Sequence, residues 1–284
     1  MTERVLALLD GTLADPDAPL LRADDLGVLR GDGVFETILV VEGRPLELEP
    51  HLARLARSAA MLDLPSPDLD AWRGCAHAVI DAWRGGREMV LKLVLTRGRE
   101  SSGGVTGFAT GAPVPALSHA QRRDGIAAVT LTRGFAPDLA AHAPWLLLGA
   151  KTLSYAVNMA AQRHAATLGA DDVIFTTTGG GVLEGPTATV VVADGRTLRT
   201  PPPDTGILPG TTQGALFRGA AEAGWATVVE PVDVDELHAA DGVWLVSSIR
   251  LLARVHTLDG KPLSDPGLTP ELHALLPLRS VSRA

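Results

Sequence analysis

The stretch Gly149-Ala-Lys-Thr-Leu-Ser-Tyr-Ala-Val-Asn158 carries one of only three lysines in this chain of 284 residues. The others are Lys92 and Lys261, so 25 basic residues less three lysines leaves 22 arginines. Arginine cannot act as a nucleophilic amine, whereas a desolvated lysine can. The small residues and the apolar run before Lys151 favour a desolvated amine. A surface lysine at the start of a helix explains this motif alone about as well.

A second functional element is predicted in Gly206-Ile-Leu-Pro-Gly-Thr-Thr212. A glycine-containing turn that brings two hydroxyls and backbone amides to a helix N-terminus is suited to binding one phosphate. The alternative is an ordinary helix capped by Thr211 or Thr212. The chain has no Gly-x-x-x-x-Gly-Lys-Ser/Thr motif, and no Gly-x-Gly-x-x-Gly follows a strand, which argues against nucleoside triphosphates and dinucleotides.

A carboxylate, Glu184, stands at the end of a predicted strand in Val182-Leu-Glu-Gly-Pro-Thr187. If it is buried, it needs a cationic partner such as a protonated heterocycle nitrogen, whereas an exposed turn residue needs none. The eight histidines lack metal-binding spacing and Cys75 is the only cysteine, so we expect no metal site and no disulfide. No Gly-x-Ser-x-Gly elbow indicates a serine hydrolase.

The composition is that of a globular protein with a large core, with 46% hydrophobic and 20% charged residues. The formal net charge of -8 disfavours nucleic acid as a partner. The apolar run at the N-terminus is too short for a signal peptide, and no stretch approaches the roughly 20 apolar residues that span a bilayer. We therefore expect a cytoplasmic protein with no membrane partner.

Strand and helix patterns predict an α/β (α+β) protein of two domains. Strands are predicted at 5–9, 34–41, 89–96, 126–131, 173–175, 187–192 and 243–246, and helices at 50–64 and 69–83 and after residue 211. A further helix is predicted directly after Lys151, with a buried face that includes Val157, Ala160, Ala165 and Leu168. Residues 101–115, rich in Gly, Ser and Pro, are predicted to form a loop. We place the domain boundary near residue 120, giving a small domain over 1–120 and a larger one over 121–284 that carries Lys151.

The order of the motifs resembles that of the class IV aminotransferases, the fold-type IV pyridoxal phosphate enzymes. The resemblance extends from about Val5 to Leu263. The motifs that carry it are Gly31-Asp-Gly-Val-Phe-Glu-Thr37, His51-Leu-Ala-Arg-Leu55, Thr96-Arg-Gly98, Lys151, Leu183-Glu-Gly185, Leu208-Pro-Gly-Thr-Thr212 and Val246-Ser-Ser248.

This resemblance implies a small N-terminal α/β domain, a larger C-terminal pseudo-barrel domain, and pyridoxal 5'-phosphate as cofactor. It implies that Lys151 is the catalytic Schiff-base lysine and that Glu184 pairs with the pyridine nitrogen. It also implies a homodimer acting on a small-molecule substrate. The remaining cofactor-binding residues that it implies are Arg54, Thr211, Thr212, Ser247 and Ser248 for the phosphate and Tyr155 for the ring hydroxyl.

Within the family, Leu91-Lys-Leu-Val-Leu-Thr-Arg-Gly98 is similar to a segment of aminodeoxychorismate lyases in which a lysine faces the substrate, and the chain is most like the actinobacterial lyases. The implied reaction releases pyruvate from 4-amino-4-deoxychorismate to give 4-aminobenzoate for folate synthesis, with Lys92 and Arg97 binding the substrate. The alternative for Lys92 is an outward position on a solvent-facing strand.

Two departures from the lyase pattern, at Ala188-Thr189 and at Val105-Thr-Gly-Phe108, keep a second activity open. This alternative is an aminotransferase acting on branched-chain or D-amino acids. A phosphate-binding or regulatory module that lost the chemistry is a third reading, against which the retained Lys151, Glu184 and Arg54 argue.

Overall fold

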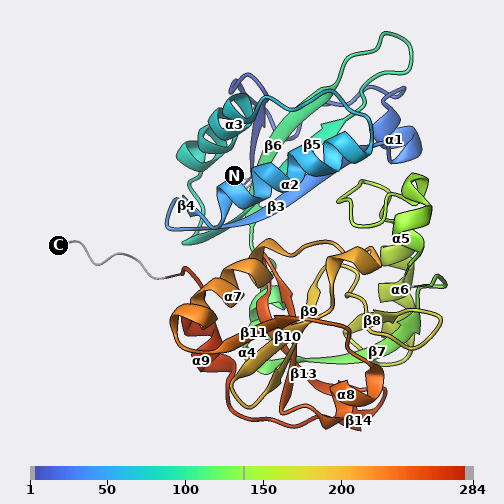
Figure 1. Cartoon of the computed structure of the whole chain (residues 1–284). Helices are drawn as coiled ribbons and strands as arrows, with labels where there is room; N and C mark the ends of the chain where they lie inside the picture. Colours follow the sequence, from blue (N-terminus) through green and yellow to red (C-terminus); the bar gives the residue numbers. More distant parts are fainter. Residues whose placement is uncertain (1–3, 137, 279–284) are drawn as a thin grey trace. The chain divides into compact units, whose positions relative to one another are not determined.

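The computed structural model describes residues 4–136 and 138–278, which form two compact units (Figure 1). The first unit contains the residues up to Pro115 together with Ala150–Tyr155, and the second contains Ala116–Gly149 and the chain from Ala156 onward. The sequence predicts a domain boundary near residue 120, and the division into units falls between Pro115 and Ala116. The segment that carries Lys151 groups with the first unit. The mixture of helices and sheets confirms the α/β class.

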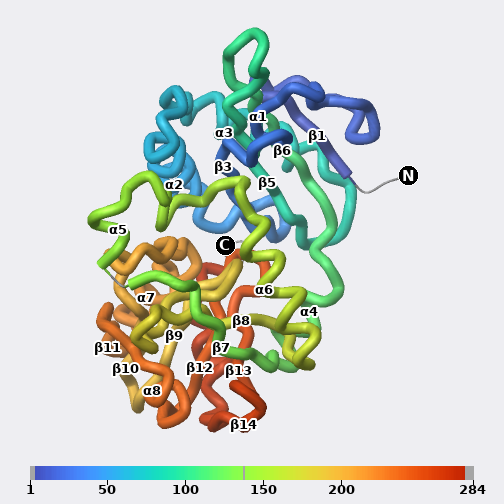
Figure 2. Tube along the Cα trace, turned by 90° about the vertical axis from the view of Figure 1, so that its right-hand side faces the viewer, coloured from blue at the N-terminus to red at the C-terminus, as the bar shows by residue number. Residues whose placement is uncertain are grey.

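The first unit is built on an antiparallel sheet of six strands in the order β2-β1-β6-β5-β3-β4. Its central strands can be followed side by side in Figure 2. The strands are β1 (Val5–Leu8), β2 (Leu13–Ala14), β3 (Gly33–Val41), β4 (Arg44–Pro45), β5 (Glu88–Thr96) and β6 (Thr106–Pro113).

Helices α2 (Leu48–Met61) and α3 (Leu69–Ala82) pack on this sheet, and the short helix α1 (Leu26–Arg30) precedes β3. Leu52 and Leu55 of α2 and Trp72 of α3 are fully buried, because helical spacing places them on one face. Burial of each such side chain stabilises the unit by about 1.5–3 kcal/mol.

The prediction of a loop over 101–115 is wrong, because β6 occupies Thr106–Pro113 within it. Glycine is needed there for packing rather than for a turn. A Cβ atom on Gly111 would lie 2.8 Å from Val79 of α3 and 2.7 Å from Met89 of β5. Close contact with neighbouring side chains therefore requires glycine at position 111, although glycine in a sequence usually indicates a loop.

The second unit contains a mixed sheet of eight strands in the order β11-β10-β9-β12-β13-β7-β8, with β14 paired to β13. Pairs β10–β11, β13–β7 and β7–β8 are parallel, and the others are antiparallel. The strands are β7 (Ile126–Thr132), β8 (Asp172–Thr176), β9 (Thr189–Asp194), β10 (Thr197–Thr200), β11 (Ala226–Val229), β12 (Gly242–Ser247), β13 (Leu251–Leu258) and β14 (Lys261–Pro262).

Helices surround this second sheet, and its core is formed by β-branched and aliphatic side chains such as Val190, Val192, Leu245 and Val255. None of the helices in the described ranges is long and apolar enough to cross a membrane. The helices are α4 (Ala116–Asp124), α5 (Leu139–His142), η1 (Pro144–Leu146), α6 (Ala156–Thr167), η2 (Pro203–Thr205), α7 (Thr211–Glu222), α8 (Val234–Ala239) and α9 (Thr269–Ala274).

Helix α6 differs from the helix predicted directly after Lys151, because it begins only at Ala156. The residues before it are extended and pair with β3. The predicted buried face is also wrong in part, since Ala165 is buried but Val157 and Leu168 are 66% and 57% exposed. Ala160 is exposed as well.

Candidate active site

Lys151 is positioned by a short extended segment that joins the edge of β3. The N–H of Phe35 donates to the carbonyl of Lys151 (3.2 Å), and the N–H of Leu153 donates to the carbonyl of Gly33 (2.8 Å). Strand β4 covers this edge only at Val40 and Val41, which leaves Gly33–Phe35 for the segment. A Cβ atom on Gly33 would lie 2.6 Å from the Leu95 carbonyl and 2.8 Å from the Leu153 side chain, so glycine allows this approach.

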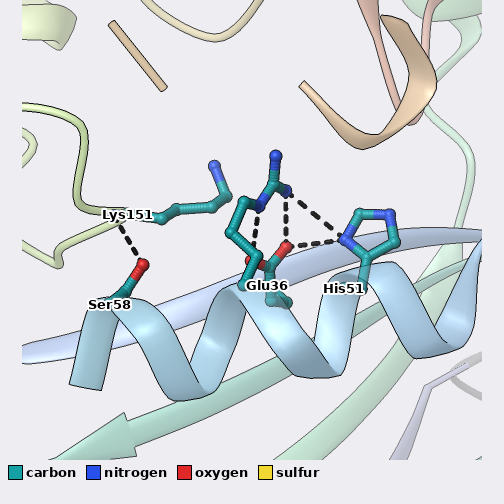
Figure 3. Close-up of polar contacts among 5 residues, drawn as sticks. Glu36, His51, Ser58 and Lys151 are labelled. Atoms are coloured by element: carbon teal, nitrogen blue, oxygen red, sulfur yellow. Dashed lines mark hydrogen bonds and ion pairs between the residues drawn. The ribbon is translucent and has the colours of Figure 1, made fainter. Parts of the chain in front are cut away.

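Helix α2 also holds Lys151 in place. The backbone N–H of Lys151 donates to the hydroxyl of Ser58 on α2 (3.1 Å), as Figure 3 shows. Its side-chain Nζ lies 4.3 Å from the centroid of the Phe35 ring and 5.7 Å from that of Tyr155. The two rings meet edge to face, with centroids 5.3 Å apart. Lys151 and Tyr155 are thus brought together, with the Lys151 amine beside two aromatic rings.

Arg54 belongs to a buried ionic cluster between α2 and β3. Its Nε and Nη2 donate to the two oxygens of Glu36 at 2.8 and 2.6 Å, and Nδ1 of His51 lies 2.7 Å from the same carboxylate. His51, Arg54 and Ser58 share one face of α2 because they are three or four residues apart. The side chains of Arg54 and Glu36 are 6% and 0% exposed.

The protonation states in this cluster follow from burial and charge. Burial raises the pKa of Glu36, but the Arg54 guanidinium and the hydrogen bonds from Arg54 and His51 outweigh it and lower this pKa to about 2. Burial lowers the pKa of His51 below its ordinary value, against the opposing effect of Glu36. At neutral pH the cluster therefore contains a carboxylate, a guanidinium and a neutral imidazole whose Nδ1–H donates to Glu36.

The two residues predicted to bind substrate lie in different surroundings. Lys92 is exposed on β5 and is paired with Thr37 of β3. Opposed residues share a sheet face, so Lys92 lies on the face that carries Phe35 and not on the face of Glu36. Arg97, in contrast, donates to the carboxylate of Asp32 and to the carbonyl of Leu62, both at 2.6 Å. This geometry favours a role for Arg97 in holding the loop after β5.

Glu184 lies in the second unit, where its side chain is only 14% exposed. Its Oε2 accepts a hydrogen bond from the backbone N–H of Leu208 (3.0 Å), in the loop that leads to α7. Its Oε1 forms an ion pair with Arg133 (3.3 Å), whose guanidinium also stacks on Phe175. Both contacts favour a charged carboxylate, which can accept a hydrogen bond from a protonated ring nitrogen.

The predicted phosphate ligands of the second unit converge on Thr189. A Cβ atom on Gly210 would lie 2.4 Å from the Thr189 hydroxyl, so Gly210 and the following Thr211 and Thr212 lie against β9. Thr189 is also paired with Val246, which Ser247 and Ser248 follow directly. The segments that carry these two pairs of hydroxyl residues thus both approach Thr189, one through Gly210 and the other through Val246.

The start of α7 adds backbone donors to these hydroxyls. Its N-cap is Gly210, which has no side chain to occupy the first N–H groups, and Thr211 and Thr212 are both buried. An uncapped helix N-terminus beside hydroxyl groups is suited to a phosphate. Each unit therefore carries residues whose chemistry fits part of pyridoxal phosphate: the first has an amine beside aromatic rings, and the second has a charged carboxylate and a turn suited to a phosphate.

Four residues of this arrangement were not assigned a role from the sequence. Glu36, His51 and Ser58 had a detectable signal, because a carboxylate inside an apolar strand needs a cation and the two helix residues share a face with Arg54. Arg133 had no such signal. No group of three or more His, Cys, Asp or Glu side chains in residues 4–136 and 138–278 is placed to hold a metal ion.

The comparisons with known proteins agree with this chemistry. The family model for amino-transferase class IV matches residues 33–258. The chain is 49% identical over 268 residues to a Mycobacterium tuberculosis protein named bifunctional aminodeoxychorismate lyase / D-amino acid transaminase, covering 91% of this chain and 93% of that protein.

Solved structures resemble the chain equally closely. A hypothetical aminotransferase from Mycobacterium tuberculosis in its PLP-bound form has a TM-score of 0.94 and 48% identity, covering 96% of each chain. A fold IV transaminase from Curtobacterium pusillum has a TM-score of 0.92 and 45% identity, covering 96% of this chain and 97% of that one. The predicted family, fold type and cofactor are confirmed: the chain belongs to the class IV aminotransferases and is an enzyme that binds pyridoxal phosphate.

Proposed function

We propose that this enzyme is a 4-amino-4-deoxychorismate lyase, which forms 4-aminobenzoate and pyruvate for folate synthesis. The observation that carries the proposal is the position of Lys92. It is an exposed cation on the face of the first sheet that carries Phe35, the ring against which Lys151 lies. The lyase substrate bears two carboxylates, and a fixed cation on this face would bind one of them.

We assign to the cofactor the residues that the family resemblance implies. Lys151 would hold it covalently, Glu184 would pair with its ring nitrogen, and Tyr155 would contact its ring hydroxyl. The phosphate would be bound by Arg54, Thr211, Thr212, Ser247 and Ser248. When bound, pyridoxal phosphate supplies an electron sink for the charge left on a substrate carbon that has lost its proton.

Lys151 moves the protons in the proposed reaction. Its neutral amine removes the proton from the carbon that bears the substrate amine, and the resulting ammonium is stabilised by the Phe35 ring. The C–O bond to the enolpyruvyl group then breaks, and the six-membered ring becomes aromatic. Nζ returns its proton to the methylene carbon of the leaving group, which gives pyruvate. The reaction balances without an amino acceptor.

A D-amino acid aminotransferase is the second candidate, because the relative from Mycobacterium tuberculosis carries both activities in its name. It would use the same proton abstraction by Lys151 but would need a keto acid as acceptor. Lys92 is expected to serve the lyase reaction alone, since a simple amino acid lacks the additional carboxylate.

The test is to give the cofactor-loaded enzyme aminodeoxychorismate with no amino acceptor and to follow 4-aminobenzoate and pyruvate together. Equimolar formation of both supports the lyase, whereas formation of neither, with transfer from D-alanine to the monocarboxylate 2-oxobutyrate retained, leaves the aminotransferase. Lys151→Ala should abolish both reactions. Lys92→Met should reduce lyase activity and spare transamination, and Lys261→Met, which removes an exposed lysine on β14, is the matched control.

We also propose that the enzyme is a homodimer. Large apolar side chains of the second unit are exposed, including Trp145 at 74% and Val157 at 66%. Exposed apolar side chains of this size favour association with a second copy. Light scattering of the cofactor-loaded enzyme should give twice the chain mass, and a single-chain mass at micromolar concentration would contradict the proposal.

A further inference from the structure

The turn that carries Ser248 is held in place by two arginines, Arg122 from outside the turn and Arg250 within it. It connects β12 to β13, and Arg122 of α4 donates from both Nε (2.9 Å) and Nη2 to the carbonyl of Ile249. The next residue, Arg250, directs its guanidinium inward to Asp172 at the start of β8, with Nη1 2.6 Å from Oδ2. The two residues that follow Ser248 are thus attached to two different elements.

The contact between Arg250 and Asp172 is almost fully shielded from water. Their side chains are 10% and 0% exposed. The other oxygen of Asp172 accepts from the backbone N–H of Val173 (2.9 Å), which fixes the direction of the carboxylate. Nη2 of Arg250 is buried and has no hydrogen-bond partner within the described part of the chain.

An ion pair with these features is a poor device for stability alone. Taking both charges out of water costs more than an apolar pair of similar volume, and an unsatisfied N–H adds to that cost. What such a pair provides is one defined geometry. The end of the turn shows the same constraint, because Leu251 is buried with φ of +58°, a left-handed conformation that leucine adopts only where its surroundings enforce it.

We propose that Arg250, Asp172 and Arg122 are positioning residues for phosphate binding, which hold the hydroxyl of Ser248 toward the cofactor phosphate. The inference rests on the proposed role of Ser248 as a phosphate ligand. None of the three residues contacts the phosphate in this proposal. They act by preventing the turn from moving, since a hydrogen bond weakens when its donor leaves the favourable distance and angle.

The test compares two cofactors that differ only in the phosphate. The full chain is freed of cofactor and titrated with pyridoxal 5'-phosphate and with pyridoxal. The dissociation constant for pyridoxal divided by that for pyridoxal 5'-phosphate reports the contribution of the phosphate, and this quotient is the ratio used below. Arg250→Met and Asp172→Asn should each lower this ratio about tenfold, the value of one hydrogen bond to a charged group. Affinity for pyridoxal should be unchanged, and Arg250→Lys should recover part of the ratio.

Arg122→Met is the second variant, because it keeps the buried ion pair and removes only the bonds to the Ile249 carbonyl. It should lower the ratio in the same direction. Arg199→Met is the matched control, since Arg199 forms ion pairs with Asp194, Glu230 and Glu236 in the same unit and is 15% exposed. This control should lower the Tm and leave the ratio unchanged.

Ser248→Ala distinguishes the role of Ser248 as a phosphate ligand from the positioning role of Arg122, Arg250 and Asp172. A lower ratio in Ser248→Ala with an unchanged ratio in Arg122→Met and Arg250→Met overturns the positioning role and leaves the phosphate assignment intact. An unchanged ratio in Ser248→Ala overturns both the assignment and the inference. The lyase assay is independent of either result, because the readout is binding.

Discussion

Replacing Glu36 with Gln is expected to expose the energetic role of the buried cluster in the first unit. The variant keeps the shape and the hydrogen-bonding oxygen but removes the charge that both bonds from Arg54 share. The guanidinium then stays buried without the negative charge of Glu36, since its side chain is only 6% exposed. Breaking one side of a buried ion pair costs about 3–5 kcal/mol, and we expect the free energy of unfolding of the cofactor-free protein to fall by that amount.

The cofactor should reduce this loss if Arg54 binds its phosphate. A phosphate dianion supplies the negative charge that the Glu36→Gln variant lacks, so the loss in the loaded enzyme should be clearly smaller than in the cofactor-free protein. Glu36→Gln should therefore gain more stability from pyridoxal phosphate than the wild-type chain gains.

The assay is urea unfolding followed by circular dichroism, with and without cofactor. The control is Glu49→Gln on α2, because Glu49 accepts from Arg73 with the same two-bond geometry, at 2.8 and 2.9 Å, but Glu49 is exposed and Arg73 only half-buried. The control should leave the free energy of unfolding nearly unchanged. A loss below about 1 kcal/mol for Glu36→Gln, the value of an exposed pair, would refute the reasoning.

Other substitutions and conditions test separate parts of the structure. Gly210→Ala should weaken binding of pyridoxal phosphate and cost about 1–3 kcal/mol of stability, because the added methyl group overlaps β9, whereas Gly214→Ala within α7 should be neutral or stabilising. Burial raises the pKa of Cys75 to about 11, so we expect no alkylation at neutral pH by mass spectrometry until the chain is unfolded, and rapid labelling of the native protein would contradict this. On acidification the Tm should fall in two stages, because the unfolded chain binds protons that the folded chain does not. The first stage comes as the pH drops below 6.5 through His51, and the second below 4.5 through Glu36, whose folded pKa is about 2; a Tm that stays constant from neutrality to pH 4.5 would contradict the first stage.

The family and cofactor could be predicted because spaced short motifs carry them, but individual contacts could not. Glu36 lies in a quoted motif, and only the structure shows that it neutralises Arg54 and orients His51. Arg97 illustrates the same limit in the other direction, since its motif suggested substrate binding while its guanidinium is held by Asp32. The residue type predicts that a buried charged side chain needs a partner, and the packing of distant segments decides which residue that partner is.

Secondary structure was predictable where the spacing of apolar residues was clearly helical, as in α2 and α3. The prediction failed where packing required residues that are unusual for the element. Strand β6 contains glycines that make room for α3 and β5, so its composition resembles a loop. The extended segment after Gly149 was predicted as a helix because its apolar residues continue the pattern of α6. Its pairing with an open edge of β3 is a long-range contact that no local pattern predicts.

The pairing of Lys151–Leu153 with β3 has a consequence for how the chain is made. During synthesis the residues up to Pro115 leave the ribosome first, and the edge of β3 at Gly33–Phe35 has no partner until the chain has grown past Leu153. An unpaired edge is a site of association between nascent chains. The amine thus arrives together with the extended segment that pairs with this edge, so a truncated product ending before residue 150 lacks both the reactive group and the partner of β3 at Gly33–Phe35.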